Sequence, residues 1–212
     1  MIVDRYSTDT IRVGNLTLDA AALNAYIDRA ASAYGTGVEF GMSGQNWLPD
    51  TPLGGNSKID CTGFCWWATY RSRGGSGLWP PSDNWFELPG PVAGCAVRRG
   101  ALPGQSNGHA GMVVAVGGGN FATLDSSSTD PKPHSGAIRY SDNGKALWMS
   151  KPDLHFVVSG QAVLAIDGVP HKRSLNLLLA AAKRPIISTL AVLAVVGGGV
   201  WWWRKRRKGR AA

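Results

Sequence analysis

GHAGMVVAVGGGNFATLD, residues 108–125, has the pattern of two β-strands joined by a glycine turn. An apolar run follows His109 and leads into three glycines, after which residues 121–125 return as a second strand. His109 stands at the start of the first strand, where a base is held rigidly and still reaches solvent. Side chains alternate along a strand, so Thr123 and Asp125 share one face of the second strand. Either one is suited to accept a hydrogen bond from the His109 ring.

The segments around this hairpin predict a chain with helices first and strands after. Apolar residues recur at helical spacing over residues 19–34, and a second helix is expected over residues 60–71. Residues 35–55 and 74–94 are expected to be loops, since both are rich in turn-forming residues. The expected strands cover residues 110–116, 121–124, 137–140 and 155–158. This order predicts an α+β fold with an antiparallel sheet.

Cys61 is the candidate nucleophile, because it opens the second expected helix. The positive end of a helix dipole and its free backbone N–H groups stabilise a thiolate. The small Thr62 and Gly63 that follow leave room for a substrate carbonyl. Cys65 lies one turn further along among aromatic residues, so we expect it to be buried and inert. The third cysteine, Cys95, follows Gly94 at the expected start of another strand.

Composition and charge exclude several classes of protein. The 212-residue chain is 44% apolar and 17% charged, which excludes a wholly disordered chain. Residues 1–171 carry 12 Lys and Arg against 14 Asp and Glu, whereas residues 172–212 carry 10 Lys and Arg and no acidic residue. The net charge of +8 therefore belongs to the C-terminal part, and we expect no specific nucleic-acid recognition by the body. Three cysteines without zinc-site spacing also lead us to expect no metal.

The C-terminal segment has the chemistry of a membrane anchor. Residues 186–203 are 18 residues without a charge, and a helix of that length spans about 27 Å, close to the hydrocarbon core of a bilayer. The segment ends in three Trp, and residues 204–212 add six cations. We therefore predict a globular domain over residues 1–167, a basic juxtamembrane linker over 168–185, a transmembrane helix over 186–203 and a basic tail over 204–212.

The sequences around Cys61 and His109 together resemble one enzyme family. Asp60-Cys61-Thr62-Gly63-Phe64 resembles the Asp-Cys-Ser-Gly-Phe motif of the NlpC-type cell-wall cysteine peptidases, which have a papain-like fold. Gly108-His109-Ala110-Gly111 resembles the Gly-His-Val-Gly strand of the same family, and the separation of 48 residues between the two motifs is typical of it. The resemblance spans residues 20–160.

Two further segments match the family in the right order, with departures. Residues 37–44 resemble its Gly-Val-Pro-Tyr-x-x-Gly-Gly loop, with Phe40 in place of the usual Tyr. Residues 94–97 resemble its Gly-Asp-x-Val segment, with Cys95 in place of Asp. The family's third polar residue is often a His about 12 positions after the first. No His stands there, so we choose Asp125, with Thr123 as the alternative.

The resemblance implies a peptidoglycan hydrolase with a papain-like fold, in which a catalytic helix packs on an antiparallel sheet. Cys61 would attack an amide carbonyl in the peptide stem, and His109 would act as base and then as acid. The resemblance also implies that Phe40, Asp60 and Thr62 contact the substrate and that no cofactor is needed. The expected partners are then peptidoglycan and a lipid membrane, which residues 186–203 would span. The basic tail would bind anionic lipid or packaged DNA.

Other activities and two locations stay open on the sequence alone. An acyltransferase or deamidase would use the same site, because the acyl-enzyme can pass to an amine instead of water. A membrane-anchored virion structural protein would retain Cys61 and His109 without activity. The cations after the anchor predict a single-pass protein with a cytoplasmic C-terminus, yet Met1–Tyr6 does not begin a signal peptide. The internal membrane of a phage virion and the bacterial inner membrane both fit these features.

Overall fold

The computed structural model describes residues 1–41, 50–55, 57–70, 85–101, 108–127 and 137–171. Within these residues, the main sheet has six strands and each neighbouring pair is antiparallel. Its order is β5 (Trp85–Leu88), β10 (His155–Ser159), β6 (Ala96–Arg99), β7 (His109–Gly117), β8 (Asn120–Ser126) and β9 (Ile138–Ser141). The expected α+β class with an antiparallel sheet is confirmed.

Two smaller sheets accompany the main one in the described residues. The first has the order β1 (Thr10–Val13), β2 (Leu16–Asp19), β11 (Val163–Ile166) and β12 (Val169–Pro170). The second is a short parallel pair of β3 (Glu39–Phe40) and β4 (Lys58–Ile59). β4 leads directly into the helix that begins at Cys61, so this pair fixes the approach of the chain to Cys61.

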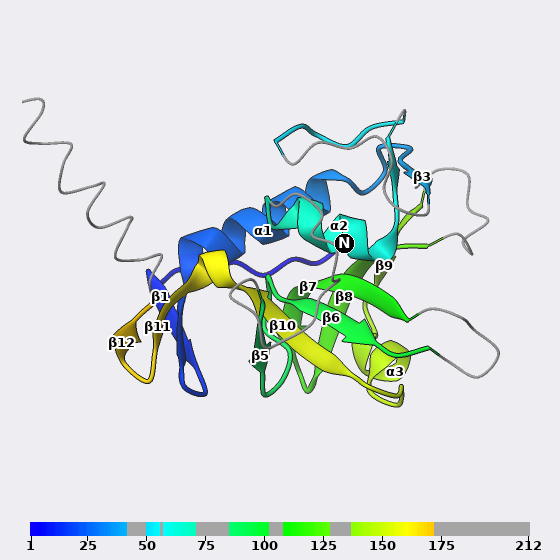
Figure 1. Ribbon diagram of the computed structural model, residues 1–212. Coiled ribbons are helices and arrows are strands. Elements are labelled where there is room, and N and C mark those ends of the chain that lie inside the picture. Colours follow the sequence, from blue (N-terminus) through cyan, green and yellow to red (C-terminus); the bar gives the residue numbers. More distant parts are fainter. Residues whose placement is uncertain (42–49, 56, 71–84, 102–107, 128–136, 172–212) are drawn as a thin grey trace, which may run out of the picture. The chain divides into compact units, whose positions relative to one another are not determined.

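The helices pack against the strands of the main sheet and against one another. α1 (Ala20–Ser32) begins at Asp19, whose side chain accepts hydrogen bonds from the Ala21 and Ala22 N–H groups at 2.9 and 3.2 Å. α2 (Cys61–Ala68) contacts β7 and β8, and α1 and α2 lie over one face of the main sheet (Figure 1). α3 (Gly144–Trp148) contacts β8, and the 3₁₀-helix η1 (Gly160–Ala162) contacts α1.

The end of α2 differs from the sequence expectation for a local reason. The helix was expected to reach residue 71, but it ends at Ala68. Tyr70 has a φ of 56°, in the left-handed region that commonly ends helices. The Tyr70 N–H donates to the Trp67 carbonyl at 3.0 Å, which closes the last turn.

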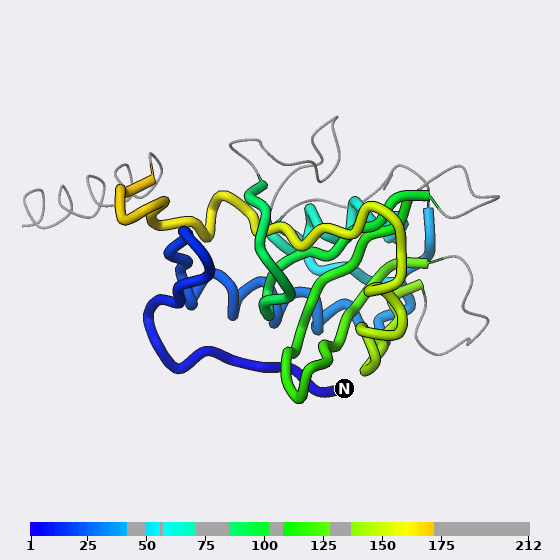
Figure 2. The backbone as a smooth tube through the Cα atoms, turned by 90° about the horizontal axis from the view of Figure 1, so that it is seen from below, coloured from blue at the N-terminus to red at the C-terminus, as the bar shows by residue number. Residues whose placement is uncertain are grey.

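The predicted hairpin is confirmed, and its turn explains its glycines. β7 ends at Gly117 and β8 begins at Asn120, so only Gly118 and Gly119 connect them. Both have positive φ, 60° and 73°. A two-residue turn of this kind matches the twist of the strands that it joins. The extended N-terminal segment (Figure 2) also contacts β7, since the Asp4 N–H donates to the Val114 carbonyl at 2.8 Å. The turn and this segment together fix the position of β7.

Both expected loops are wrong in part, since β3 lies within residues 35–55 and β5 lies within residues 74–94. Residues 74–94 were expected to form a loop, but β5 lies within that range and pairs with β10 along its whole length. Its partner strand lies about seventy residues further along the chain, so local composition gave no sign of the pairing. Trp85 is buried at 1% exposure in this strand, as are Trp66 and Trp67 in α2 at 2% and 1%. These tryptophans therefore belong to the core.

The first compact unit of the chain covers Met1–Val169, and the second covers Pro170–Ala212. The first ends two residues beyond the expected boundary at Asp167. The expected transmembrane helix over 186–203, most of the linker and the basic tail lie outside the described residues. Among the described residues, no helix has both the length and the apolar character needed to span a bilayer.

Candidate active site

The start of α2 meets the start of β7, and this brings Cys61 to His109. Asp60 caps α2, and its carboxylate accepts a hydrogen bond from the Gly63 N–H at 2.5 Å. The cap fixes Cys61 as the first residue of the helix, where backbone N–H groups are unpaired within the helix. His109 is the first residue of β7, and its side chain lies close enough to the Cys61 thiol to lower the pKa of that thiol. Two residues that are 48 positions apart in the sequence thus come together where a helix and a strand begin.

The surroundings of Cys61 favour its thiolate. Burial raises the pKa of the Cys61 thiol, but a hydrogen bond from His109, the charge of His109 and a hydrogen bond from the Ala110 N–H together outweigh burial. The pKa therefore lies below its ordinary value. The Cys61 side chain is only partly buried, so it remains accessible to a substrate. A thiolate, and not a thiol, is the attacking species in cysteine chemistry.

His109 is held by a carboxylate on its other side. The Nε2 atom of His109 lies 2.5 Å from Oδ2 of Asp125, which is 1% exposed. Burial lowers the pKa of His109, but the hydrogen bonds to Asp125 and Cys61 and their charges outweigh burial and raise the pKa to about 9. The lowered pKa of Cys61 and the raised pKa of His109 both favour the thiolate and imidazolium forms of these two groups.

Asp125 is itself anchored by an arginine that sequence reasoning missed. Nη2 of Arg139 lies 2.6 Å from the same Oδ2 atom that accepts from His109. Asp125 and Arg139 are directly paired across β8 and β9, and directly paired residues have side chains on the same face. The arginine thus compensates the buried carboxylate and fixes its orientation toward the imidazole.

Trp148 is a second missed residue, and it explains the role of Thr123. The Trp148 ring stacks on the His109 ring, with centroids 5.4 Å apart and planes 3° apart. Its Nε1–H donates to Oγ1 of the fully buried Thr123 at 3.2 Å. Of the two candidates for the third position, the structure therefore places Asp125 on the imidazole, while Thr123 holds the ring that packs against it.

Gly111 is required by this packing. A methyl group at Gly111 would lie 2.9 Å from the Leu124 carbonyl, 3.0 Å from Cβ of Asp125 and 3.3 Å from the Trp148 ring. Any larger side chain would push apart the two groups that orient His109. The second glycine of the Gly108-His109-Ala110-Gly111 motif therefore has a steric role in the site.

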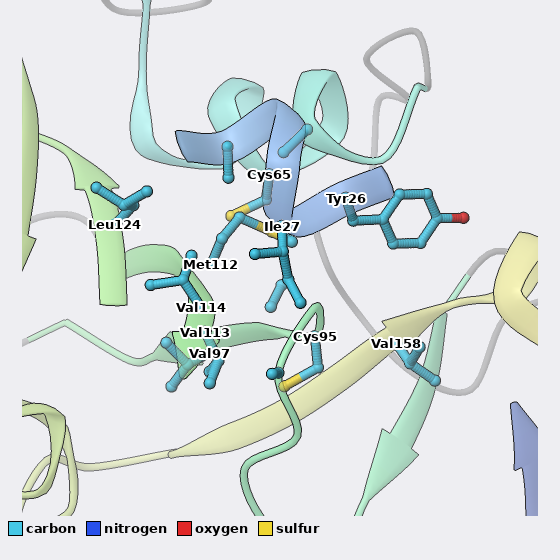
Figure 3. Close-up of a cluster of buried hydrophobic side chains, with 14 of the residues drawn as sticks. Tyr26, Ile27, Cys65, Cys95, Val97, Met112, Val113, Val114, Leu124 and Val158 are labelled. Carbon is cyan, nitrogen blue, oxygen red and sulfur yellow. The ribbon is translucent and has the colours of Figure 1, made fainter. Parts of the chain in front are cut away.

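The other two cysteines are unsuited to catalysis. Cys65 and Cys95 are both fully buried among apolar side chains of the core (Figure 3). Burial raises the pKa of Cys65 well above its ordinary value, and burial raises the pKa of Cys95 to about 12. The expectation that Cys65 is buried is confirmed, and Cys61 differs from both in exposure and in the direction of its pKa.

The three expected substrate contacts have different surroundings. Thr62 is half-buried, and its Oγ1 lies 4.0 Å from Sγ of Cys61, so it flanks the nucleophile. Phe40 is half-buried on β3 and pairs with Ile59, two residues before Cys61. Asp60 is 5% exposed and caps α2, so its observed role is structural. Within the described ranges, no cluster of three or more metal-ligating side chains occurs.

Replacing Asp125 tests which residue orients His109. We expect Asp125→Ala to lower hydrolysis by about ten- to a thousandfold, because the imidazole loses its acceptor and faces Arg139 instead. Thr123→Val removes only the acceptor of Trp148, so its effect should be smaller. Steady-state kinetics of both variants on one substrate decides the order. A silent Asp125→Ala beside a damaging Thr123→Val would show that the third residue is Thr123.

No known protein-family model matches the chain, and no curated protein is significantly similar to it. Solved structures with partial similarity include that of Ly7917, at 17% identity and a TM-score of 0.40, over 65% of this chain and 62% of that one. Ly7917 with the hydrolyzing product of MDP is 19% identical at a TM-score of 0.36 over the same shares. NlpC1 from Trichomonas vaginalis is 17% identical at a TM-score of 0.36, over 72% of this chain and 47% of that one. The chain thus spans less than two thirds of each, and its activity must be argued from the geometry around Cys61.

Proposed function

We propose that this chain is a papain-like cysteine hydrolase that cleaves an amide bond in the peptide stem of peptidoglycan. The observation that carries the proposal is the arrangement of Cys61, His109 and Asp125. Cys61 stands at a helix start, His109 lies close enough to its thiol to lower the pKa of that thiol, and Asp125 accepts a hydrogen bond from the imidazole. A nucleophile, a base and an orienting group in this arrangement are suited to acyl transfer.

The reaction follows from the protonation states of the pair. The Cys61 thiolate attacks the amide carbonyl, a C–S bond forms, and the carbonyl oxygen gains the negative charge. The backbone N–H of Cys61, at the start of α2, is placed to stabilise that oxyanion. The His109 imidazolium then gives its proton to the nitrogen as the C–N bond breaks. Water attacks the acyl carbon while His109 accepts one of its protons, and the C–S bond then breaks to restore the Cys61 thiolate. The product acid leaves and gives its proton to solvent, so that it ends as a carboxylate.

The substrate class is supported by the sequence motifs rather than by the geometry alone. The motifs around Cys61 and His109 resemble those of cell-wall peptidases, and the small Thr62 and Gly63 leave the thiol side of the helix open to a backbone carbonyl. The series of three residues suits any amide or ester. The choice of a stem peptide is therefore the part of the proposal that experiment must decide.

The test is to incubate the full chain with purified peptidoglycan and with soluble stem peptides, and to identify products by mass spectrometry. One new amine and one new carboxylate for each cut bond are expected. Protein alkylated with iodoacetamide is the matched control and should be inactive. An acyl group found on an added amine instead of water would assign acyl transfer. Intact peptides beside an unalkylated, folded protein would overturn the proposal.

We also propose that residues 186–203 anchor the protein in a membrane. The uncharged 18-residue run, its three terminal Trp and the six cations that follow support this part of the proposal. The tail would then contact anionic lipid, or packaged DNA if the membrane lies inside a virion. A bacterial inner membrane is the alternative location.

Truncation after His171 tests the anchor, because the first compact unit is already complete at Val169. We expect the truncated protein to stay in solution and keep its thiol reactivity, since Cys61, His109 and Asp125 are all retained. It should also lose cosedimentation with anionic vesicles, because ten cations are removed with no acidic residue. Vesicle binding that survives truncation with its salt dependence intact would contradict this expectation, and an unfolded product would show that the tail belongs to the core.

A further inference from the structure

β6 ends in an arginine that lies beside the catalytic pair. Arg99 is the last residue of β6 and is directly paired with His109, the first residue of β7. Directly paired residues of antiparallel strands have side chains on one face, with Cβ atoms about 4.5–5.5 Å apart. The half-buried Arg99 side chain therefore lies next to the His109 ring. Its Nη1 donates to the Gly100 carbonyl at 2.9 Å, which holds the guanidinium at the strand end.

The guanidinium of Arg99 also interacts electrostatically with Cys61. Burial lowers the pKa of Arg99, while the negative charges of Cys61 and Asp125 act in the opposite direction. Asp125 already accepts from His109 and Arg139 through Oδ2. Among the described residues, two arginines with different surroundings therefore accompany the site: Arg139 bonds the orienting carboxylate, and Arg99 is paired in register with His109.

We propose that Arg99 is a specificity residue that binds a carboxylate of the substrate next to the scissile amide. A guanidinium has five N–H donors in a planar fork, so it binds a carboxylate in two parallel hydrogen bonds while it keeps contacts with the protein. The inference deepens the proposed function and rests on it, because a peptide carries carboxylates at its C-terminus and on acidic side chains. It predicts that amides flanked by a free carboxylate are preferred.

Alkylation of Cys61 in the full chain tests the charge of Arg99 without any peptide. Iodoacetate and iodoacetamide react in the same way: Sγ attacks the CH₂ group, a C–S bond forms and iodide leaves. The two reagents differ only in that iodoacetate carries a negatively charged carboxylate where iodoacetamide carries a neutral amide. Arg99→Met should lower the ratio of the iodoacetate rate to the iodoacetamide rate by about threefold or more. Arg99→Lys should keep most of the ratio because it keeps the charge.

The matched control is Arg12→Met, which removes an exposed arginine from β1 in another sheet. It should leave the ratio unchanged, because an exposed distant charge is screened by salt. A ratio that is equal in Arg99→Met and in the unmodified protein, or one that falls equally in Arg12→Met, would overturn the inference.

Stem peptides with a free carboxylate next to the cut bond, compared with their carboxamides, test the role in recognition. Arg99→Met should raise KM for the acid by about tenfold or more and should narrow the preference for the acid over the carboxamide. An unchanged preference would overturn the inference while the proposed function stands. If no stem peptide is cut by any variant, the proposed function fails, and the alkylation ratio still decides whether Arg99 selects an anion.

Discussion

Cys61→Ala is expected to lower hydrolysis of the stem amide by about four orders of magnitude or more, because the substitution removes the thiol that would form the acyl-enzyme. Both remaining cysteines are fully buried, and burial raises the pKa of each thiol. The residual rate should be close to that of a folded protein with no nucleophile. Product formation measured by mass spectrometry over long incubations checks the size of the loss.

The matched controls for Cys61→Ala are the same substitution at the other two cysteines. Cys65→Ala and Cys95→Ala remove one sulfur from the core, so they should cost stability through a small cavity while activity stays of the same order. Thermal unfolding separates the two effects. A comparable loss of hydrolysis in Cys95→Ala without loss of folded protein would mean that Cys61 is not the sole nucleophile.

Much of the fold was predictable because its signals are local. The apolar run after His109, the three glycines and the returning strand predicted β7, its turn and β8 almost to the residue. The start of α2 was predicted to within one residue, since the helix was expected from residue 60 and begins at Cys61, with Asp60 as its cap. The strand β5 was missed because it is fixed by pairing with β10, a partner that local composition does not reveal.

The residues of the candidate site also divide into those that local sequence indicated and those that it did not. Cys61, His109 and Asp125 were chosen from local context, at a helix start, a strand start and the end of the returning strand. Arg139 and Trp148 were missed because each reaches the site through strand register or helix packing that the local sequence does not specify. Arg139 stands opposite Asp125 only once β8 and β9 are aligned. The stacking of Trp148 on His109 depends on where α3 docks, and no spacing in the sequence indicates that position.

The pH dependence of the site should be controlled by the pair of Cys61 and His109. Because the pKa of Cys61 is lowered, its thiolate persists as the pH falls below the ordinary thiol range, and hydrolysis should fail only as the pH drops through that lowered pKa. Because the pKa of His109 is raised to about 9, the imidazolium persists up to about that pH. Above it, the leaving amine has no proton donor. Hydrolysis should therefore follow a bell-shaped profile with its upper limb near pH 9.

His109→Ala should abolish both limbs of this pH profile, because it removes the group that stabilises the thiolate and the donor that protonates the amine. We expect it to lower hydrolysis by about a thousandfold. Cys61 then loses the hydrogen bond and the charge that outweighed burial. Its pKa should rise above the ordinary value, and alkylation by iodoacetamide should become slow at neutral pH with its midpoint shifted upward. The rate of alkylation against pH measures that shift directly, without any peptide substrate.

His155→Ala is the matched control for His109→Ala. His155 lies on β10 of the same sheet and is also hydrogen-bonded to a carboxylate, that of Glu87, at 2.6 Å. It therefore reproduces the loss of an imidazole and of its hydrogen bond to a carboxylate without touching the thiol. We expect its alkylation profile to match that of the unmodified protein. If His109→Ala gave the same profile as His155→Ala, the thiolate would owe its stability to the start of α2 alone, and His109 would act only as the acid that releases the amine.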